Sequence, residues 1–404
     1  MKRIIHIYIK SYSGLSSAAW LLALVMLINR MGSMVIPFLG MYMTKQLGFD
    51  ISHVGIVLAC YGCGSVAGSW LGGWLTDRIG NFKVQSISLI MTAPLFLLMP
   101  MFRTFESMAA IVFVLSLVAD TFRPANSVSV ARYAKPENLT KAYSLNRMAV
   151  NLGFSIGPAL GGFLAAFSYN WIFYGNAIAV AIAAVVFLYF FYNKKGNKVT
   201  KKTEKELQTE VKDRNPYTDG PFIIFSVLCC LFSMAFFQLI STLPLFYQDV
   251  HHMSEREIGM ILGFSGFVIV VFEMLLVHIV EHRATITRIL FYGTLCAGLS
   301  YLMLNFNFGI AWLYIAMFML SLGEMLTLPF MATVTALRST RNTQGAYMGM
   351  NSIAFASSNI FGPFLGTKTV ALWGYHTLWY IDAAILVLVA FGFIWALKRL
   401  GLNQ

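Results

Sequence analysis

The chain has 404 residues, of which 58% are apolar and only 11% carry a charge. A soluble protein carries about twice that charged fraction, so the composition excludes an ordinary soluble protein and indicates a polytopic membrane protein. The formal net charge of +12 favours nucleic-acid binding only if the positions of the charges are ignored, because most of them flank apolar segments.

Apolar windows of about 20 residues, the length that spans a bilayer core, divide the chain into twelve predicted helices. The first six cover 16–44, 53–77, 84–102, 107–131, 142–167 and 170–193. The second six cover 221–247, 257–281, 284–304, 308–333, 344–367 and 373–398. The first stretch is too long for a signal-peptide core and lacks a small-residue cleavage pattern, so we expect it to remain in the protein.

One long polar stretch separates the two sets of helices. Residues 194–220 carry eight basic and five acidic side chains, which is typical of a solvated linker. We therefore predict a six-helix bundle over 1–193, a cytoplasmic linker over 194–220 and a second six-helix bundle over 221–404.

The lysines and arginines predict the orientation in the membrane. If both termini are cytoplasmic, the inner side holds 23 of these side chains and the outer side holds four. Arg30 and Arg123 lie within predicted helices. Because basic residues concentrate on the cytoplasmic side of membrane proteins, this bias predicts cytoplasmic termini and explains the net charge without nucleic acid.

The two halves of the chain repeat each other. Asp120 and Glu324 stand 204 residues apart in apolar stretches, and each is followed closely by a proline, Pro124 or Pro329. Similar offsets of 204 to 206 relate the pairs Gly55 and Gly259, Asp77 and Glu281, Tyr143 and Tyr347, Pro158 and Pro363, and Tyr169 and Tyr375. We therefore expect an all-α membrane protein of twelve helices in two parallel, pseudo-repeated six-helix bundles.

The turn after the second predicted helix carries a family motif. It reads Gly73-Trp-Leu-Thr-Asp77-Arg78-Ile-Gly80-Asn-Phe-Lys83 and resembles the signature of the major facilitator superfamily. The resemblance implies that Asp77 faces the start of helix 11 near Gln344. It also implies that the motif forms an inner gate, with the gating residues Gly73, Asp77, Arg78, Gly80 and Lys83.

The fifth predicted helix carries a run of small residues. Gly153, Gly157, Pro158, Gly161 and Gly162 resemble the motif typical of the superfamily's antiporters, although Ser144 stands where that motif begins with glycine. Glycines allow neighbouring helices to approach closely. We interpret the run as a helix-packing motif, and close packing alone explains it as well as an antiport-specific role does.

Gly323-Glu324 and Pro329 in helix 10 resemble the twelve-span drug:proton antiporters of the LmrP and MdtH type. A charged side chain at the bilayer centre costs about 2.5–3.5 kcal/mol on insertion scales, so Glu324 indicates function. No basic residue lies three or four positions from Glu324 on its helix, whereas Asp120 is spaced to pair with Arg123. For the pair of Asp120 and Arg123, a structural ion pair and a role in proton coupling remain equally open.

In this superfamily helices 1, 4, 7 and 10 line a central cavity. The resemblance therefore implies a proton-coupling group of Glu324, Asp120 and Arg30. It also implies that the substrate cavity includes Arg123, Gln238, Asn146 and Glu273, and for Glu273 we favour a structural role slightly. Asn146 stands where related antiporters can carry an acid, which leaves the number of coupled protons open.

We predict a proton-coupled antiporter that exports small amphipathic or cationic compounds by alternating access. The alternatives are a proton symporter or dedicated metabolite exporter on the same fold and, more remotely, a non-transporting membrane receptor. No nucleophile–base or metal-ligand pattern stands out, so we expect no enzyme activity, cofactor or metal. The expected partners are a small-molecule substrate, protons and the lipid bilayer, and we expect a monomer in the bacterial cytoplasmic (inner) membrane.

Overall fold

The computed structural model describes residues 12–32, 34–193, 215–281 and 283–402. This described part of the chain forms helices and no strand, and nine of its helical segments are long and apolar enough to cross a membrane. The predicted class, an all-α polytopic membrane protein, is confirmed. The predicted linker falls largely on residues 194–214, which lie outside the described residues.

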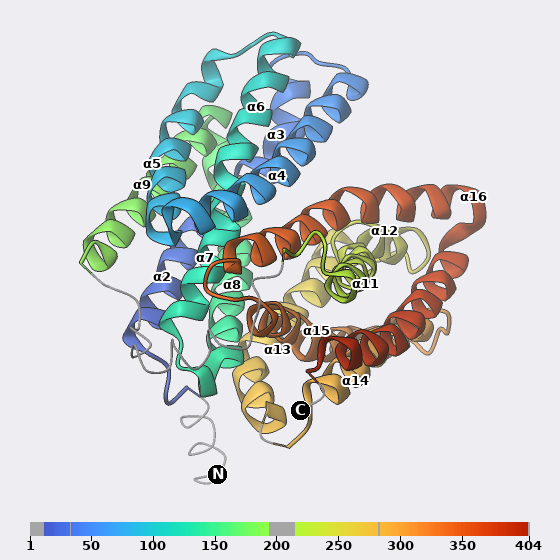
Figure 1. Cartoon of the computed structure of the whole chain (residues 1–404). Helices are drawn as coiled ribbons and strands as arrows, with labels where there is room; N and C mark the ends of the chain where they lie inside the picture. Colours follow the sequence, from blue (N-terminus) through green and yellow to red (C-terminus); the bar gives the residue numbers. More distant parts are fainter. Residues whose placement is uncertain (1–11, 33, 194–214, 282, 403–404) are drawn as a thin grey trace. The chain divides into compact units, whose positions relative to one another are not determined.

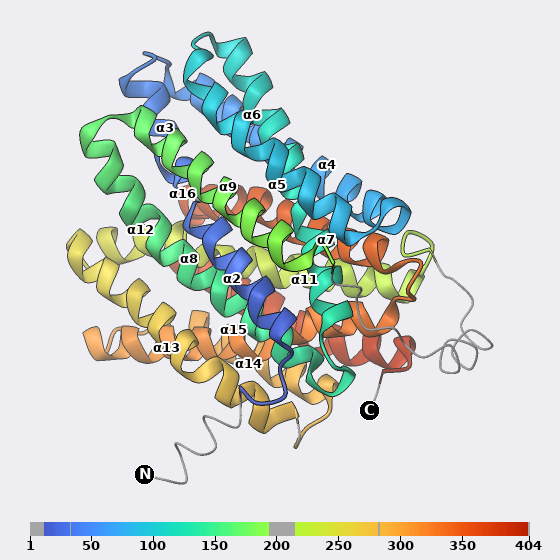
Figure 2. The same cartoon turned by 90° about the vertical axis from the view of Figure 1, so that its left-hand side faces the viewer.

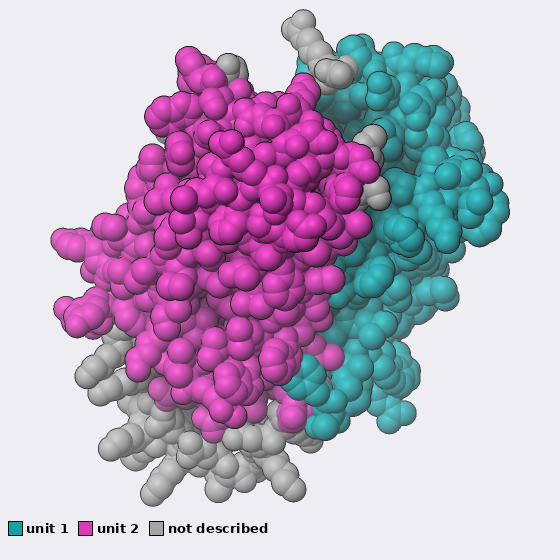
Figure 3. All heavy atoms as spheres, turned by 90° about the horizontal axis from the view of Figure 1, so that it is seen from above, with its two compact units in different colours: residues 1–13, 217–338, 354–404 teal, residues 14–216, 339–353 magenta. Residues whose placement is uncertain are grey.

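The chain forms two compact units, which Figure 3 colours separately. The N-terminal unit comprises 14–216 and 339–353, and the C-terminal unit comprises 217–338 and 354–404, together with 1–13. The division predicted from the sequence did not assign 339–353 to the first unit. This segment contains the beginning of a long helix and packs with the N-terminal helices.

Among the residues that the structure describes, the N-terminal unit contains α2 (Ser17–Met31), α3 (Val35–Lys45), α4 (Ile51–Ile79), α5 (Asn81–Leu98), α6 (Phe105–Asp120), α7 (Phe122–Tyr133), α8 (Leu139–Phe167) and α9 (Tyr169–Phe191) (Figure 1). Helix α4 packs along α6, α5 along α9, and α2 against α8 and α9, as Figure 2 also shows. Gly64, Gly68 and Gly72 face α6 at four-residue spacing, and a Cβ at Gly72 would lie 2.5 Å from the Thr121 carbonyl oxygen. The absence of side chains at these positions allows the two backbones to approach closely.

The C-terminal unit is built from α11 (Gly220–Phe236), α12 (Thr242–Asp249), α13 (Glu255–Glu281), α14 (Ile286–Met303), α15 (Ile310–Arg338) and most of α16 (Gln344–Leu400). Helix α15 packs against both α13 and α14. A Cβ at Gly323 would lie 2.7 Å from the Ala297 nitrogen, so this glycine brings α15 close to α14 beside Glu324. The packing therefore positions the predicted proton site.

Several predicted helices are interrupted. The first divides after Met31 into α2 and α3, and the seventh divides between α11 and α12. The fourth divides at Thr121, because Pro124 has no N–H to donate to the carbonyl of Asp120 four residues earlier. Predicted helices 11 and 12 form the single segment α16, which turns at Gly374 with a φ of +80°. Glycine adopts this backbone conformation without the strain that a Cβ would introduce.

Candidate functional site

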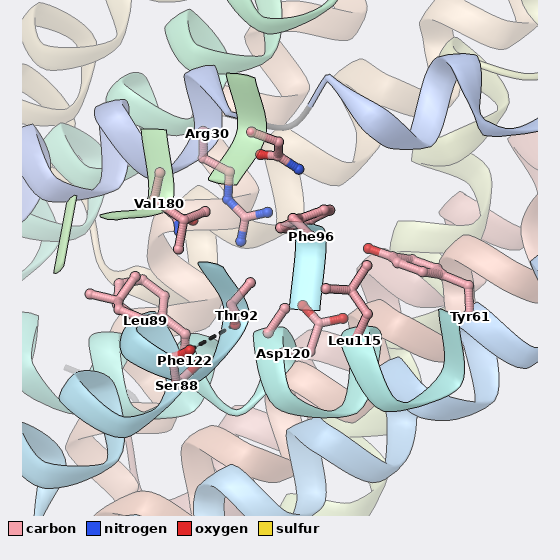
Figure 4. A pocket seen from close by; sticks show the side chains of 13 residues that line it. Arg30, Tyr61, Ser88, Leu89, Thr92, Phe96, Leu115, Asp120, Phe122 and Val180 are labelled. Carbon is pink, nitrogen blue, oxygen red and sulfur yellow. Dashed lines mark hydrogen bonds between the residues drawn. The ribbon is translucent and has the colours of Figure 1, made fainter. Parts of the chain in front are cut away.

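A small cavity in the N-terminal unit contains the predicted charged residues of helices 1 and 4. It has a volume of about 60 Å³, and Figure 4 shows Arg30 from α2, Asp120 from α6 and Tyr61 from α4 directed toward it. We call it the arginine cavity. Its polar lining residues are Asn29, Arg30, Tyr61, Ser88, Thr92, Asp120 and Asn176.

Asp120 and Arg123 form the local pair that their spacing predicts. Arg123 Nε lies 2.8 Å from Asp120 Oδ1, and the Asp120 side chain is 4% exposed whereas that of Arg123 is 28% exposed. Arg30 interacts electrostatically with Arg123, Asp120 and Tyr61. The structure therefore brings Arg30, Asp120 and Arg123 together in one unit and adds Tyr61, whose role the sequence analysis missed.

The glycines of α8 allow the backbone of α2 to lie close at Arg30. A Cβ at Gly153 would collide with Arg30 Cβ, and one at Gly157 would lie 3.1 Å from the carbonyl oxygens of Arg30 and Met31. The Arg30 guanidinium also lies 5.6 Å from the ring centre of Phe154 on α8. The predicted packing motif therefore contacts α2 at Arg30 and sets the position of this residue.

The rest of that motif contacts the beginning of α3. A Cβ at Gly161 would lie 3.0 Å from Met34 Cβ and from the ring of Phe38, whereas one at Gly162 would lie 3.6 Å from that ring. A side chain at position 161 would therefore be crowded, whereas one at position 162 would make an ordinary van der Waals contact. Pro158 belongs to the same helix, and its side chain is outside those that the structure describes.

Asn146 is engaged in packing. Its side-chain oxygen accepts a hydrogen bond of 3.1 Å from Asn126 Nδ2, which joins α8 to α7. The residues that line the arginine cavity do not include Asn146. This contact favours a structural role over direct contact with a substrate.

Glu324 lies in the interior of the C-terminal unit. It is 3% exposed and borders a crevice too narrow for a water molecule. The other lining residues are Phe232, Phe236, Ala297, Tyr301, Leu320 and Leu386. Most of these walls are apolar, and Tyr301 carries the polar group among them.

Gln238 and Glu273 are also buried in this unit. The Gln238 amide nitrogen donates to the carbonyl oxygen of Gly362 at 2.9 Å, and its oxygen accepts from Thr242 Oγ1 at 2.7 Å. This amide joins the end of α11 to α12 and α16. Glu273 is fully buried. The predicted roles of both residues stay predictions.

Asp77 caps the beginning of α16 within the N-terminal unit. Its two carboxylate oxygens accept hydrogen bonds from the backbone N–H groups of Gly345 at 2.6 Å and Ala346 at 2.7 Å. The first N–H groups of a helix have no partner within the helix, and the helix dipole favours a negative charge there. A Cβ at Gly73 would lie 2.6 Å from the Gly345 carbonyl oxygen, so this glycine permits the contact.

The remaining gating residues have other surroundings. Arg78 lies 4.0 Å from the ring centre of Trp74 on its own helix, and Lys83 is exposed at the beginning of α5. Gly80 joins α4 to α5 with a φ of +90°. The gating role of these three residues stays a prediction.

Arg132 adds hydrogen bonds around the Asp77 contact. Its guanidinium donates to the carbonyl oxygen of Arg341 at 3.3 Å, to the Asn81 side chain at 3.0 Å and to Gln344 Oε1 at 3.4 Å. Arg132 was not among the predicted site residues. The sequence feature that could have indicated these contacts is the place of Arg132 at the end of a helix, beside a charged turn.

Asp382 is a further buried acid of the C-terminal unit. It lies in α16 and is 5% exposed, and both Asp382 and Glu324 interact electrostatically with Tyr301. Within the described residues, no group of three or more His, Cys, Asp or Glu side chains is arranged to hold a metal ion.

The chain matches the family model of the Major Facilitator Superfamily over residues 19–358. It is 26% identical to the uncharacterized MFS-type transporter YttB of Bacillus subtilis, with 92% of each chain covered. It is 25% identical to Multidrug resistance protein 2 of the same organism, covering 91% of this chain and 92% of the relative. Its structure resembles that of the proton:xylose symporter XylE with a TM-score of 0.75, 13% identity and 94% of each chain covered.

These matches extend over nearly the whole chain and agree with its helical structure and apolar spans. The fold predicted from the repeat and the motif at Asp77 is confirmed. The chain is a membrane transporter and not an enzyme, and it belongs to the major facilitator superfamily.

Proposed function

We propose that this transporter is a proton-coupled antiporter that exports small amphipathic or cationic compounds. The observation that carries the proposal is Glu324, a carboxyl group buried beside apolar side chains in a helix long enough to cross the membrane. A buried acid inside a membrane span marks a functional site, because keeping it there is costly. The similarity to Multidrug resistance protein 2 supports the choice of substrate class.

The transport cycle alternates between two states of Glu324. On the outer side Glu324 binds a proton, and the loss of its negative charge lowers affinity for a cationic substrate. The protonated carrier then returns to the inner side, releases the proton to the cytoplasm and binds substrate again. Asp120 and Arg30 act as the charged counterpart in the N-terminal unit, and Arg123, with its partly exposed side chain, remains a candidate for the substrate cavity.

The Asp77 cap serves as the inner gate in this proposal. Its two hydrogen bonds to the beginning of α16 form in one state of the cycle and break in the other. Arg132 supports the same contact through the Arg341 carbonyl oxygen and Gln344. The protein acts as a monomer in the bacterial cytoplasmic membrane with both termini in the cytoplasm, which the distribution of basic residues supports.

The test compares wild type with Glu324→Gln in proteoliposomes, with ethidium as the probe. We expect the variant to lose uphill transport driven by a pH gradient. It should retain exchange of labelled for unlabelled ethidium, which needs no net proton movement. Glu106→Gln, which removes an exposed acid from the first turn of α6, is the matched control and should behave as wild type. Normal uphill transport by Glu324→Gln would contradict the proposal.

A proton symporter or a dedicated metabolite exporter is the second candidate. The structural similarity to a proton:xylose symporter shows that the fold also supports symport. A buried acid suits either direction of coupling, so the relative direction of proton and substrate movement distinguishes the two.

A further inference from the structure

The charged cluster formed by the residues of the arginine cavity together with Arg123, which contacts Asp120 from outside the lining, holds more positive than negative charge. Arg30, Arg123, Asp120 and Tyr61 interact electrostatically with one another. The phenol is neutral near pH 7, because tyrosine ordinarily titrates near pH 10. Two guanidinium groups and one carboxylate therefore leave a net charge of +1.

Only one oxygen of the Asp120 carboxylate is engaged, because Oδ1 lies 2.8 Å from Arg123 Nε whereas Oδ2 is buried without a hydrogen-bond partner in the described structure. The other acids in residues 14–193 are Asp50, Asp77, Glu106 and Glu137, none of which lines the cavity. Within residues 14–193, Arg30 therefore shares the single acid of the cavity with Arg123.

Arg30 also has unused hydrogen-bonding capacity. Its Nε is shielded from solvent and has no hydrogen-bond partner in the described part of the chain. A buried charge with an unsatisfied donor is costly in a membrane protein, and it is tolerated where the group faces water or a ligand. Figure 4 shows the guanidinium among the side chains that line the cavity.

The volume and lining of the cavity define what it can hold. A water molecule requires about 10–15 Å³ of such space, so about 60 Å³ accommodates a small ion with a few waters. Ligands of drug size require about 300–1,000 Å³. Tyr61, Asn29 and Asn176 can each donate a hydrogen bond, whereas the hydroxyls of Ser88 and Thr92 already donate to carbonyl oxygens.

We infer that the arginine cavity is a binding site for one small monovalent anion, held by Arg30 with help from Tyr61 and the two asparagines. The shared ligand chemistry is a single negative charge that accepts hydrogen bonds. A free halide ion and the carboxylate of a small molecule both have it. This site is separate from Glu324 and does not depend on the proposed antiport.

The experiment uses purified full-length protein in lipid nanodiscs at pH 7 and constant ionic strength, with sodium gluconate as the starting salt. Radiolabelled chloride and radiolabelled acetate are tested separately for binding by equilibrium dialysis. We expect about one bound anion per protein, and competition between the two labels identifies whether halide or carboxylate binds better. The unfolding temperature should rise with anion concentration in the same saturable manner, because a ligand of the folded state stabilises it.

Arg30→Met, which removes the charge while keeping an extended side chain, should abolish anion binding. Arg30→Lys should keep it with at least tenfold weaker affinity, and this variant serves if Arg30→Met does not fold. Arg103→Met removes an exposed arginine and should bind as wild type. Wild-type protein that retains neither label, or equal binding by Arg30→Met, would overturn the inference.

Discussion

The Asp77 cap leads to a prediction about one local contact. Asp77→Asn retains the side-chain shape but removes the charge and one of the two acceptor oxygens that now bind Gly345 and Ala346. A hydrogen bond to a charged group contributes about 1.5–3 kcal/mol, and the interaction with the helix dipole about 0.3–1 kcal/mol. Because Asp77 is only partly buried, solvent weakens both terms, and we take about 2 kcal/mol as the loss.

Hydrogen–deuterium exchange measures this loss directly. Each 1.4 kcal/mol changes an equilibrium tenfold, so about 2 kcal/mol should increase opening, and hence amide exchange in residues 339–353, by about 30-fold. The measurement is mass spectrometry of peptides from protein in nanodiscs. Asp50→Asn is the matched control, because Asp50 caps the exposed start of α4 by accepting from the His53 N–H at 2.8 Å.

In the control, exchange should increase near residue 53 and remain unchanged in residues 339–353. Unchanged exchange of that segment in Asp77→Asn would refute the reasoning. Unprotected exchange of the Gly345 and Ala346 amides in wild type would also refute it, because the carboxylate would then not be protecting them.

Two further predictions concern stability and are measured by thermal unfolding of the purified variants. Gly153→Ala places a methyl group against Arg30 and should destabilise the folded protein by about 1–3 kcal/mol. Gly162→Ala is the control and should be tolerated, because the nearest neighbour of its methyl group would lie at 3.6 Å. Equal melting temperatures of the two variants would show that α2 and α8 do not pack this closely. Asp219→Asn removes the charge and one of the two oxygens that accept from Arg338 at 2.8 and 3.1 Å, which should cost about 1.5–3 kcal/mol. Asp249→Asn changes an exposed partner of Tyr375 and should have a smaller effect, so a larger loss in Asp249→Asn would contradict this assignment.

The apolar runs and the basic residues that flank them were sufficient to predict the helical membrane class. The repeated motifs then identified the family, because they place small and charged residues at positions that the fold constrains. The pairing of Asp120 with Arg123 was also predictable, since it depends only on three-residue spacing along one stretch of chain.

Interruptions of the helices were less predictable. The same acid–proline pattern is followed by a break in one half and by continuous helix in the other. Thr121 separates α6 from α7, whereas α15 continues through Pro329. Proline removes a hydrogen bond in both cases, and packing against neighbouring helices decides whether the helix continues.

Long-range contacts of the site could not be predicted from the sequence either. The contacts of Arg132 with residues 341 and 344, and the burial of Asp382, depend on segments far apart in the chain. Neither follows from periodicity or local spacing. Gln238 illustrates the converse, because a polar residue in an apolar helix suggested a cavity whereas its amide joins neighbouring helices.

The direction of proton movement tests the central claim most directly. Wild-type protein is reconstituted with a pH-sensitive dye inside the vesicles and no initial pH gradient, and an outward ethidium gradient is then imposed. Proton-coupled antiport predicts acidification of the vesicle interior as ethidium leaves, and no such change with Glu324→Gln. Alkalinisation of the interior, which signifies protons leaving together with ethidium, or ethidium transport without any pH change would contradict the account.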